Sequence, residues 1–152
     1  MQVRSYKKTD AEGVYNLVAS IFASEFSDIP SRGFLADLEN VDKNYGNDNE
    51  GFWVVKQDDN IIGVVSIKCE DEKTALLRRL FVNPHYRGKG VASALVKEAL
   101  DFCKKHNYKK VSFLGNSKMS AAKNALLKMG FHEEDGVDLG QLSVYRLKYF
   151  IE

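Results

Sequence analysis

The chain has 152 residues, 44% of them hydrophobic and 28% charged, which is typical of one globular domain spanning residues 1–152 with its own core. Its 22 basic and 21 acidic residues leave a formal net charge of +1, so we expect neither nucleic acid nor an anionic membrane as a partner. No apolar run has the length of a signal peptide or a membrane span, and this predicts a cytoplasmic protein.

The N-terminal part predicts a short strand at residues 3–6, followed by a helix. Thr9 and Glu12 have the spacing of a capping box, and apolar residues then recur at helical intervals until Phe26. A second, weaker helix is expected over residues 33–41, before a polar loop at 45–50. The cysteines Cys69 and Cys103 lack the clustered spacing of a zinc site or a disulfide framework, so we expect core packing and no metal.

The middle of the chain predicts strands followed by a helix. Residues 51–56 and 61–67 are β-rich and are separated by a turn sequence, which indicates a hairpin. A further strand over residues 75–82 is expected to end at Pro84, because proline cannot donate to a strand ladder. A glycine-containing loop at 85–90 precedes a clear amphipathic helix that carries Leu95, Val96 and Ala99 on one face.

The C-terminal part predicts a strand at 111–114, a short helix at 121–129 closed by Gly130, and a final strand at 142–150. The acidic stretch that begins at His132 is interpreted as a solvated turn. Strands that first form hairpins and are later separated by helices predict an α/β fold with a mixed sheet and helices on both of its faces.

The loop at Arg87-Gly88-Lys89-Gly90 is the segment most indicative of chemistry. Two glycines one residue apart permit a tight turn with inward-pointing amides, and the following helix adds unpaired amides and a positive dipole end. That arrangement binds phosphate. The pattern matches neither a Walker loop nor a dinucleotide fingerprint, and alone it is equally compatible with a tight strand-to-helix turn.

Residues 80–92, Leu-Phe-Val-Asn-Pro-His-Tyr-Arg-Gly-Lys-Gly-Val-Ala, closely resemble the acetyl-CoA motif of the GNAT superfamily, with Arg87, Gly90 and Ala92 at its defining positions. Lys128-Met129-Gly130-Phe131 is similar to the closing signature of that family. The resemblance covers nearly the whole chain and is vague only before Gly51. It implies a mostly antiparallel sheet with one splayed parallel pair, between the strands at 80–82 and 111–114.

The resemblance implies a cofactor site and an oxyanion donor. The amides of six consecutive residues would hold the pyrophosphate, with Arg87 shaping the loop: Gly88, Lys89, Gly90, Val91, Ala92 and Ser93. The backbone of Leu80, Phe81 and Val82 would pair with the pantetheine arm as an added strand does. The Val82 amide would then stabilise the thioester oxyanion. Lys123, like Lys89, could meet phosphates or merely be solvated.

The sequence departs from the family at the positions that normally supply acid and base. The tyrosine that commonly protonates the leaving thiolate is replaced by Leu126, and an asparagine that contacts pantetheine is replaced by Met119. Residues 76–79 contain no glutamate. Holding amine and thioester together can still remove a large entropic barrier, so we expect catalysis mainly by positioning.

Other side chains are candidates for the missing catalytic and binding roles, and each also has an ordinary structural explanation. Tyr145 could face the slot or simply pack, Glu25 or Asp28 could bind or deprotonate an amine or simply be solvated, and Asn116 could contact ligand or form a turn. The histidines His85 and His132 are weaker candidates. Phe26 and Phe34 are expected to pack, and of the aromatic residues they are the best placed to line an acceptor pocket.

These observations predict an acetyl-CoA-dependent N-acetyltransferase. Acetyl-CoA is expected as cosubstrate, without metal, and a small-molecule or peptide amine as acceptor, in a possible homodimer. The alternative is a catalytically weakened acyl-CoA-binding or sensing module, which Leu126 and Met119 favour. A purely structural domain is disfavoured, because packing alone does not require Gly-Lys-Gly at the start of a helix.

Overall fold

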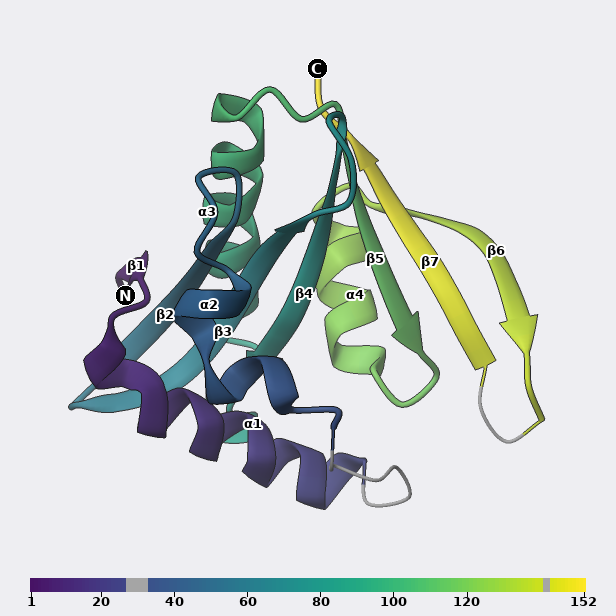
Figure 1. Cartoon of the computed structure of the whole chain (residues 1–152). Helices are drawn as coiled ribbons and strands as arrows, with labels where there is room; N and C mark the ends of the chain where they lie inside the picture. The colour runs from purple at the N-terminus through teal and green to yellow at the C-terminus, as the bar shows by residue number, and fades with distance from the viewer. Residues whose placement is uncertain (27–32, 141–142) are drawn as a thin grey trace.

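The computed structural model describes residues 1–26, 33–140 and 143–152, and among them seven strands form one sheet. The order across the sheet is β1-β2-β3-β4-β5-β7-β6 (Figure 1). The strands are β1 Val3–Ser5, β2 Gly51–Gln57, β3 Asn60–Cys69, β4 Thr74–Val82, β5 Lys110–Asn116, β6 His132–Asp138 and β7 Ser143–Phe150. Of the pairs between these described strands, β4 with β5 is parallel and the rest are antiparallel. The expected mixed sheet is therefore confirmed.

Helices cover both faces of the sheet. They are α1 Ala11–Glu25, α2 Val41–Asn44, α3 Val91–Lys105 and α4 Ser120–Lys128, with 3-10 turns η1 Lys8–Asp10, η2 Ala36–Glu39 and η3 Pro84–Tyr86. One buried cluster joins α1, η2 and α2 to the near face, where Val54, Val64 and Phe81 lie, and a second joins α3 and α4 to the far face (Figure 1). β3, covered on both faces, is buried almost throughout, as expected for a central strand.

The hairpin of β2 and β3 forms as its sequence predicts. Asp58 and Asp59 both have positive φ, 51° and 68°, the conformation of a tight two-residue hairpin turn whose twist matches the strands. Gly63 in β3 is required for packing: a Cβ there would lie 2.8 Å from Val91 at the start of α3. The glycine thus brings the sheet and the N-terminal turn of α3 into close contact.

The start of α1 differs from the prediction. Thr9 and Glu12 form no capping box, because the carboxylate of buried Asp10 already accepts the Lys7 amide at 2.9 Å and the Arg4 guanidinium at 2.8 Å. The turn η1 leads directly into α1 at Ala11. The Asp10 carboxylate thus fixes the turn η1 against β1, and α1 itself begins without a side-chain cap.

Two further predicted segments differ in the structure. The helix expected over 33–41 is broken at Asn40, where the backbone is extended and the side chain accepts the Lys43 amide to begin α2. The stretch from His132 is strand β6 and not a turn. Its charges suit an edge strand, since Glu134 pairs with Lys148 at 2.9 Å. Leu142, expected to start the last strand, lies outside the described residues.

Among the described residues, no helix is long and apolar enough to cross a membrane. Cys103 is buried in the far-face core, and burial raises the pKa of its thiol to about 12, so it behaves as an inert packing residue.

Candidate active site

The site is a cleft where β4 and β5 separate. The two strands pair only through Thr74 with Lys110, Ala75 with Val111 and Leu76 with Ser112, and beyond that point they diverge (Figure 1). The cleft that opens has a volume of about 1010 Å³ and is walled by α1, η2, β4, β5, the start of α3 and one face of α4. A slot of this size accommodates an extended cofactor.

A bulge bends β4 at the cleft. Val64 pairs with Phe81 and Ser66 with Arg78, so Arg79 and Leu80 together lie opposite one residue of β3. Arg79 has a φ of 56°, which is unusual for a residue other than glycine. Its guanidinium binds both oxygens of Asp37, at 2.6 and 3.0 Å, and the Phe34 carbonyl. These bonds fix the bulge and tie η2 to it.

The Asp37 carboxylate is held ionised in this network. Its burial acts to raise the pKa, but hydrogen bonds from Arg79 and Tyr45, with the charge of Arg79, outweigh burial and lower the pKa below its ordinary value. Asp37 is thus a structural anchor, although it lines the cleft.

The glycine loop ends at the N-terminus of α3. Gly88 and Gly90 have φ of 75° and 85°, and the helix begins at Val91 without a side-chain cap. Within the described chain, no protein acceptor receives the amides of residues 88–93, and the first turn of α3 contains no acidic residue. These amides and the helix dipole form a site suited to an anion.

Arg87 joins three parts of the site. Its Nε donates to the Val82 carbonyl at 3.1 Å, and its two terminal nitrogens bind the Glu25 carboxylate at 2.9 and 2.8 Å. The loop is thereby tied to the end of β4 and to the last turn of α1. Glu25 was a candidate base, and the structure places it at the cleft but in a bidentate ion pair.

The Val82 amide is directed into the cleft. Asn83 donates its amide to the Ile62 carbonyl of β3 at 2.8 Å, and successive amides of a strand point to opposite sides. The Val82 amide therefore points away from β3, at the place where β5 has diverged. Leu80, Phe81 and Val82 line the cleft.

Three candidates lie outside the cleft. Tyr145, Asn116 and Lys123 gather around a smaller hollow beside α4, toward β6 and β7. The Tyr145 hydroxyl donates to the Met119 carbonyl at 3.2 Å, Asn116 accepts the Lys118 amide at 2.9 Å, and Lys123 pairs with Glu133 at 3.1 Å. Burial raises the pKa of Tyr145 to about 12. Each of the three has a structural role in this position.

The family's acid position is in the core. Leu126 is fully buried, whereas Met119, at the N-cap of α4, lines the cleft. Phe26 and Phe34 lie at the cleft as expected. His85 flanks the loop in η3, His132 lies on edge strand β6, and Asp28 is outside the described residues.

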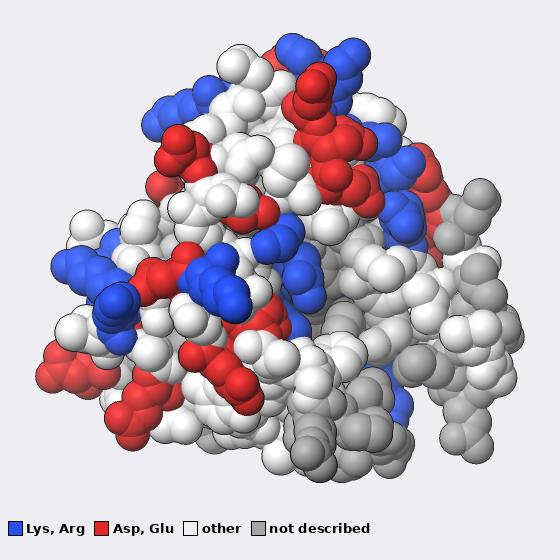
Figure 2. Space-filling model, in the orientation of Figure 1, with Lys and Arg blue, Asp and Glu red and all other residues white. Residues whose placement is uncertain are grey.

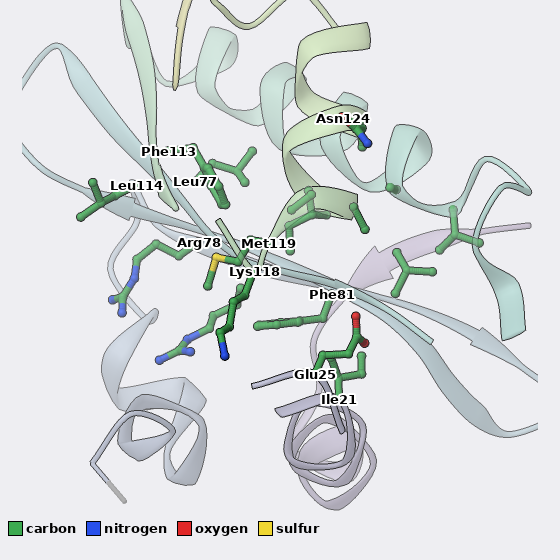
Figure 3. Close-up of a pocket in the computed structure, with 18 of the residues that line it drawn as sticks. Ile21, Glu25, Leu77, Arg78, Phe81, Phe113, Leu114, Lys118, Met119 and Asn124 are labelled. Carbon is green, nitrogen blue, oxygen red and sulfur yellow. The ribbon is translucent and has the colours of Figure 1, made fainter. Parts of the chain in front are cut away.

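Sequence reasoning missed the cationic side chains of the cleft, notably Arg78 and Lys118 (Figure 3) and Arg146 of β7. The signal available was Arg78-Arg79, two adjacent arginines inside an otherwise apolar strand. No group of three or more His, Cys, Asp or Glu side chains in the described part of the chain is arranged to hold a metal ion.

Comparison with known proteins finds a match to the acetyltransferase (GNAT) family over residues 12–131. Human N-acetylaspartate synthetase is 36% identical over 89 residues, which are 57% of this chain and 29% of that protein, so the chain spans less than a third of that relative. A GNAT-family acetyltransferase from Staphylococcus aureus Mu50 has a TM-score of 0.87 at 22% identity, covering 99% of both chains. PaiA N-acetyltransferase from Thermoplasma acidophilum, in complex with coenzyme A, has a TM-score of 0.80 at 20% identity, covering 99% of this chain and 98% of that one.

Proposed function

Because the chain belongs to the acetyltransferase (GNAT) family, we propose that it is an enzyme that moves an acetyl group from acetyl-CoA to a primary amine. The observation that carries the proposal is the splayed cleft that ends at six amides without a protein acceptor. Acetyl-CoA has an extended arm and a pyrophosphate, and it needs both a strand edge and an anion cradle. The coenzyme A complex of a protein with the same fold supports this ligand.

In this proposal the amides of residues 88–93 bind the pyrophosphate, and the free edge of β4 at Leu80 and Val82 binds the pantetheine arm. Arg87 is a positioning residue, since its hydrogen bonds are made to Val82 and Glu25. The backbone amides that follow Arg87 in the chain, and not its side chain, then contact the phosphates. The thioester carbonyl then lies near the end of β4, with the Val82 amide available to its oxygen.

The reaction is direct transfer. A neutral amine nitrogen attacks the thioester carbon, the carbonyl oxygen gains negative charge beside the Val82 amide, and the carbon–sulfur bond breaks to give the amide and the CoA thiolate. The proton lost by the amine balances the thiolate and passes through water, since Glu25 is paired and Tyr145 lies elsewhere. Names of relatives such as N-acetylaspartate synthetase support an amine acceptor. Positioning supplies most of the rate.

A binding or sensing module is the second candidate function. It is favoured by Leu126, which occupies the position of the usual acid and is buried in the core. Such a module would bind acetyl-CoA without transferring the acetyl group. Release of CoA in the presence of a broad panel of amines separates the two functions.

Binding of acetyl-CoA is the first test. We expect millimolar acetyl-CoA to raise the melting temperature by about 5 to 10 °C, as a ligand in large excess over a micromolar Kd does for a domain of this size. Gly90→Asp should remove the shift, because it adds a side chain and a negative charge to the anion site. The matched control is Gly140→Asp, which also replaces a positive-φ glycine with open space around it, away from the cleft. A Gly90→Asp protein that keeps the full shift, or a wild type that shows none, contradicts the proposed binding mode.

A further inference from the structure

The cleft carries an excess of positive charge. In the described part of the chain it is lined by six cationic side chains and three carboxylates. The cationic residues are Arg78, Arg79, Arg87, Lys118, Lys128 and Arg146, and the acidic residues are Glu25, Asp37 and Glu70. Two ion pairs, Arg87 with Glu25 and Arg79 with Asp37, account for four of these groups. The charge of Arg78 also acts on Asp37, and Glu70 is the third carboxylate among the described lining residues.

The two remaining arginines, Arg78 and Arg146, lie in one row across the gap between the diverging strands β4 and β5. Leu76 is in register with Ser112, so Arg78, two residues on, lies on the same face as Leu114, two residues beyond Ser112. Arg146 of β7 is directly opposite Leu114. This is the near face of the sheet, where Leu114 is 60% exposed and where Figure 2 shows basic side chains bordering a central hollow.

The side chains in this row are available to a ligand. Within the described residues, the Arg78 guanidinium makes no hydrogen bond or ion pair, and Arg146 donates to the Ser112 hydroxyl, at 3.4 Å. The neighbouring Glu134 is already paired with Lys148. Figure 3 shows the Arg78 side chain among the residues that line the cleft. Guanidinium groups that lack a carboxylate partner bind planar anions in two-point fashion.

The coenzyme phosphates are poorly placed to be that anion. Arg78 precedes Val82 by four residues, roughly 13 Å along a strand. The amides of residues 88–93 lie beyond Val82, past the glycine loop, and already form a complete anion site. The arginine row lies on the near face, where α1 and η2 form the cleft wall, so it is open to a second ligand that enters from that face.

We infer that the acceptor is an amine that carries a carboxylate, such as an amino acid, and that Arg78 and Arg146 bind that carboxylate while the amine lies against the thioester near Val82. This inference rests on the proposed function and names the substrate class of the same site. Polyamines and other cationic acceptors are disfavoured, because they would meet like charges.

The test compares acceptors that differ in carboxylates, with release of CoA as the readout. Aspartate, alanine and alaninamide carry two, one and none. The ammonium group of alaninamide is more acidic than that of alanine, so a larger fraction of alaninamide is neutral. A slower reaction of alaninamide therefore cannot be due to protonation of its amine. We expect kcat/KM to fall about 10- to 100-fold from alanine to alaninamide, the effect of losing a charged hydrogen-bonding partner. Alanylalanine, whose carboxylate lies further from the amine, distinguishes free amino acids from peptides.

Variants of Arg78 and Arg146 test whether these two arginines bind the carboxylate of the acceptor. Arg78→Gln and Arg146→Gln should each raise the KM for alanine or aspartate about tenfold, and should leave the KM for acetyl-CoA and the rate with alaninamide nearly unchanged. Arg78→Lys should recover part of the loss. Lys97→Gln, which removes an exposed charge of α3 outside the cleft, is the matched control. Melting temperatures show whether each variant is folded.

The outcomes separate this inference from the proposed function. Equal rates with alanine and alaninamide, or an unchanged KM for alanine in Arg78→Gln and Arg146→Gln, overturn the inference while the acetyltransferase assignment stands. If acetyl-CoA binds and no amine is acetylated, the proposed transfer is wrong. In that case calorimetric titration of aspartate into the protein with CoA bound still decides the anion site: binding that is lost in Arg78→Gln supports it, and no binding overturns it.

Discussion

Arg87 and Glu25 form a partly exposed pair, with 32% and 31% of their side chains accessible. A pair of that kind contributes at most about 1 kcal/mol to stability, so its importance is geometric. It holds the glycine loop against the last turn of α1, while the Arg87 Nε donates to the Val82 carbonyl. A single arginine thus couples the glycine loop to both β4 and α1.

Leu126 and Leu127 provide a matched pair for testing whether the family's acid position has a chemical role here. Leu126 is fully buried in the far-face core, whereas Leu127 is 40% exposed. We expect Leu126→Ala to lower the free energy of unfolding by about 2 to 4 kcal/mol, through lost burial and a cavity. Leu127→Ala should cost well under half of that. Urea denaturation measures both.

The same leucine variants should retain turnover per folded molecule, because neither side chain lines the cleft. A thousandfold loss of kcat in Leu126→Ala at unchanged stability would contradict this structural role. It would mean that the core position acts on the leaving group through the packing of α4.

At the scale of elements, the Arg79–Asp37 pair attaches η2 to the bulge of β4. The two side chains are only 8% and 14% exposed, so removing one charge leaves the other buried. We expect Asp37→Asn to destabilise the protein by about 3 kcal/mol at pH 7. Asp42→Asn, an exposed carboxylate on α2, should have little effect.

The pH dependence of this loss follows from the lowered pKa of Asp37. A carboxyl whose folded pKa is below its ordinary value of 3.8 contributes its full stabilisation above that value and loses it as pH falls through the folded pKa. The difference between wild type and Asp37→Asn should therefore be constant from pH 7 to about 5 and shrink below about pH 4. Denaturation curves at several pH values measure it. A difference that grows on acidification would contradict the assignment.

Elements with a strong local pattern could be predicted from the sequence. The β2–β3 hairpin, α3 and the glycine loop each depend on residues close together in the chain, such as Asp58 with Asp59 or Gly88 with Gly90. Strand β6 could not be predicted, because its acidic residues are typical of a solvated segment. Only the folded structure brings Lys123 and Lys148 close enough to pair with them. The same limit applies to the site. Arg79 is 42 residues from Asp37 and Arg87 is 62 residues from Glu25, so no periodicity indicates either pair.

At the scale of the whole molecule, the splay of the sheet creates the cleft. Backbone groups supply the positive charge in one part of it and side chains supply it in another. The half of the sheet from β1 to β4 has helices on both faces, and the pair β4–β5 opens where that cover ends (Figure 1). Backbone amides provide the anion site at one end, and arginine side chains provide positive charge across the near face. In the proposed function, this architecture orients two substrates from opposite sides, and positioning in place of a dedicated acid or base accounts for the rate.

The pH dependence of turnover tests that architecture as a whole. If the cleft works by positioning, kcat with alanine should rise with pH and level off near the pKa of the amine itself, because the neutral amine is the nucleophile. Glu25→Gln should keep this profile, with a rate within about a hundredfold of wild type, the lower range for removing one acid–base group. Tyr145→Phe should also keep it, since the lost hydrogen bond to the Met119 carbonyl is structural.

Rates measured at saturating acetyl-CoA between pH 6 and 10 distinguish positioning from dedicated acid–base catalysis. A bell-shaped profile that loses a limb in Glu25→Gln would identify that carboxylate as a base despite its pairing with Arg87, and loss of the other limb in Tyr145→Phe would identify an acid that moves into the cleft. Repeating the series with alaninamide provides the internal control. Its amine is more acidic, so the plateau of a positioning enzyme must begin at lower pH, whereas a profile set by a protein group stays where it was.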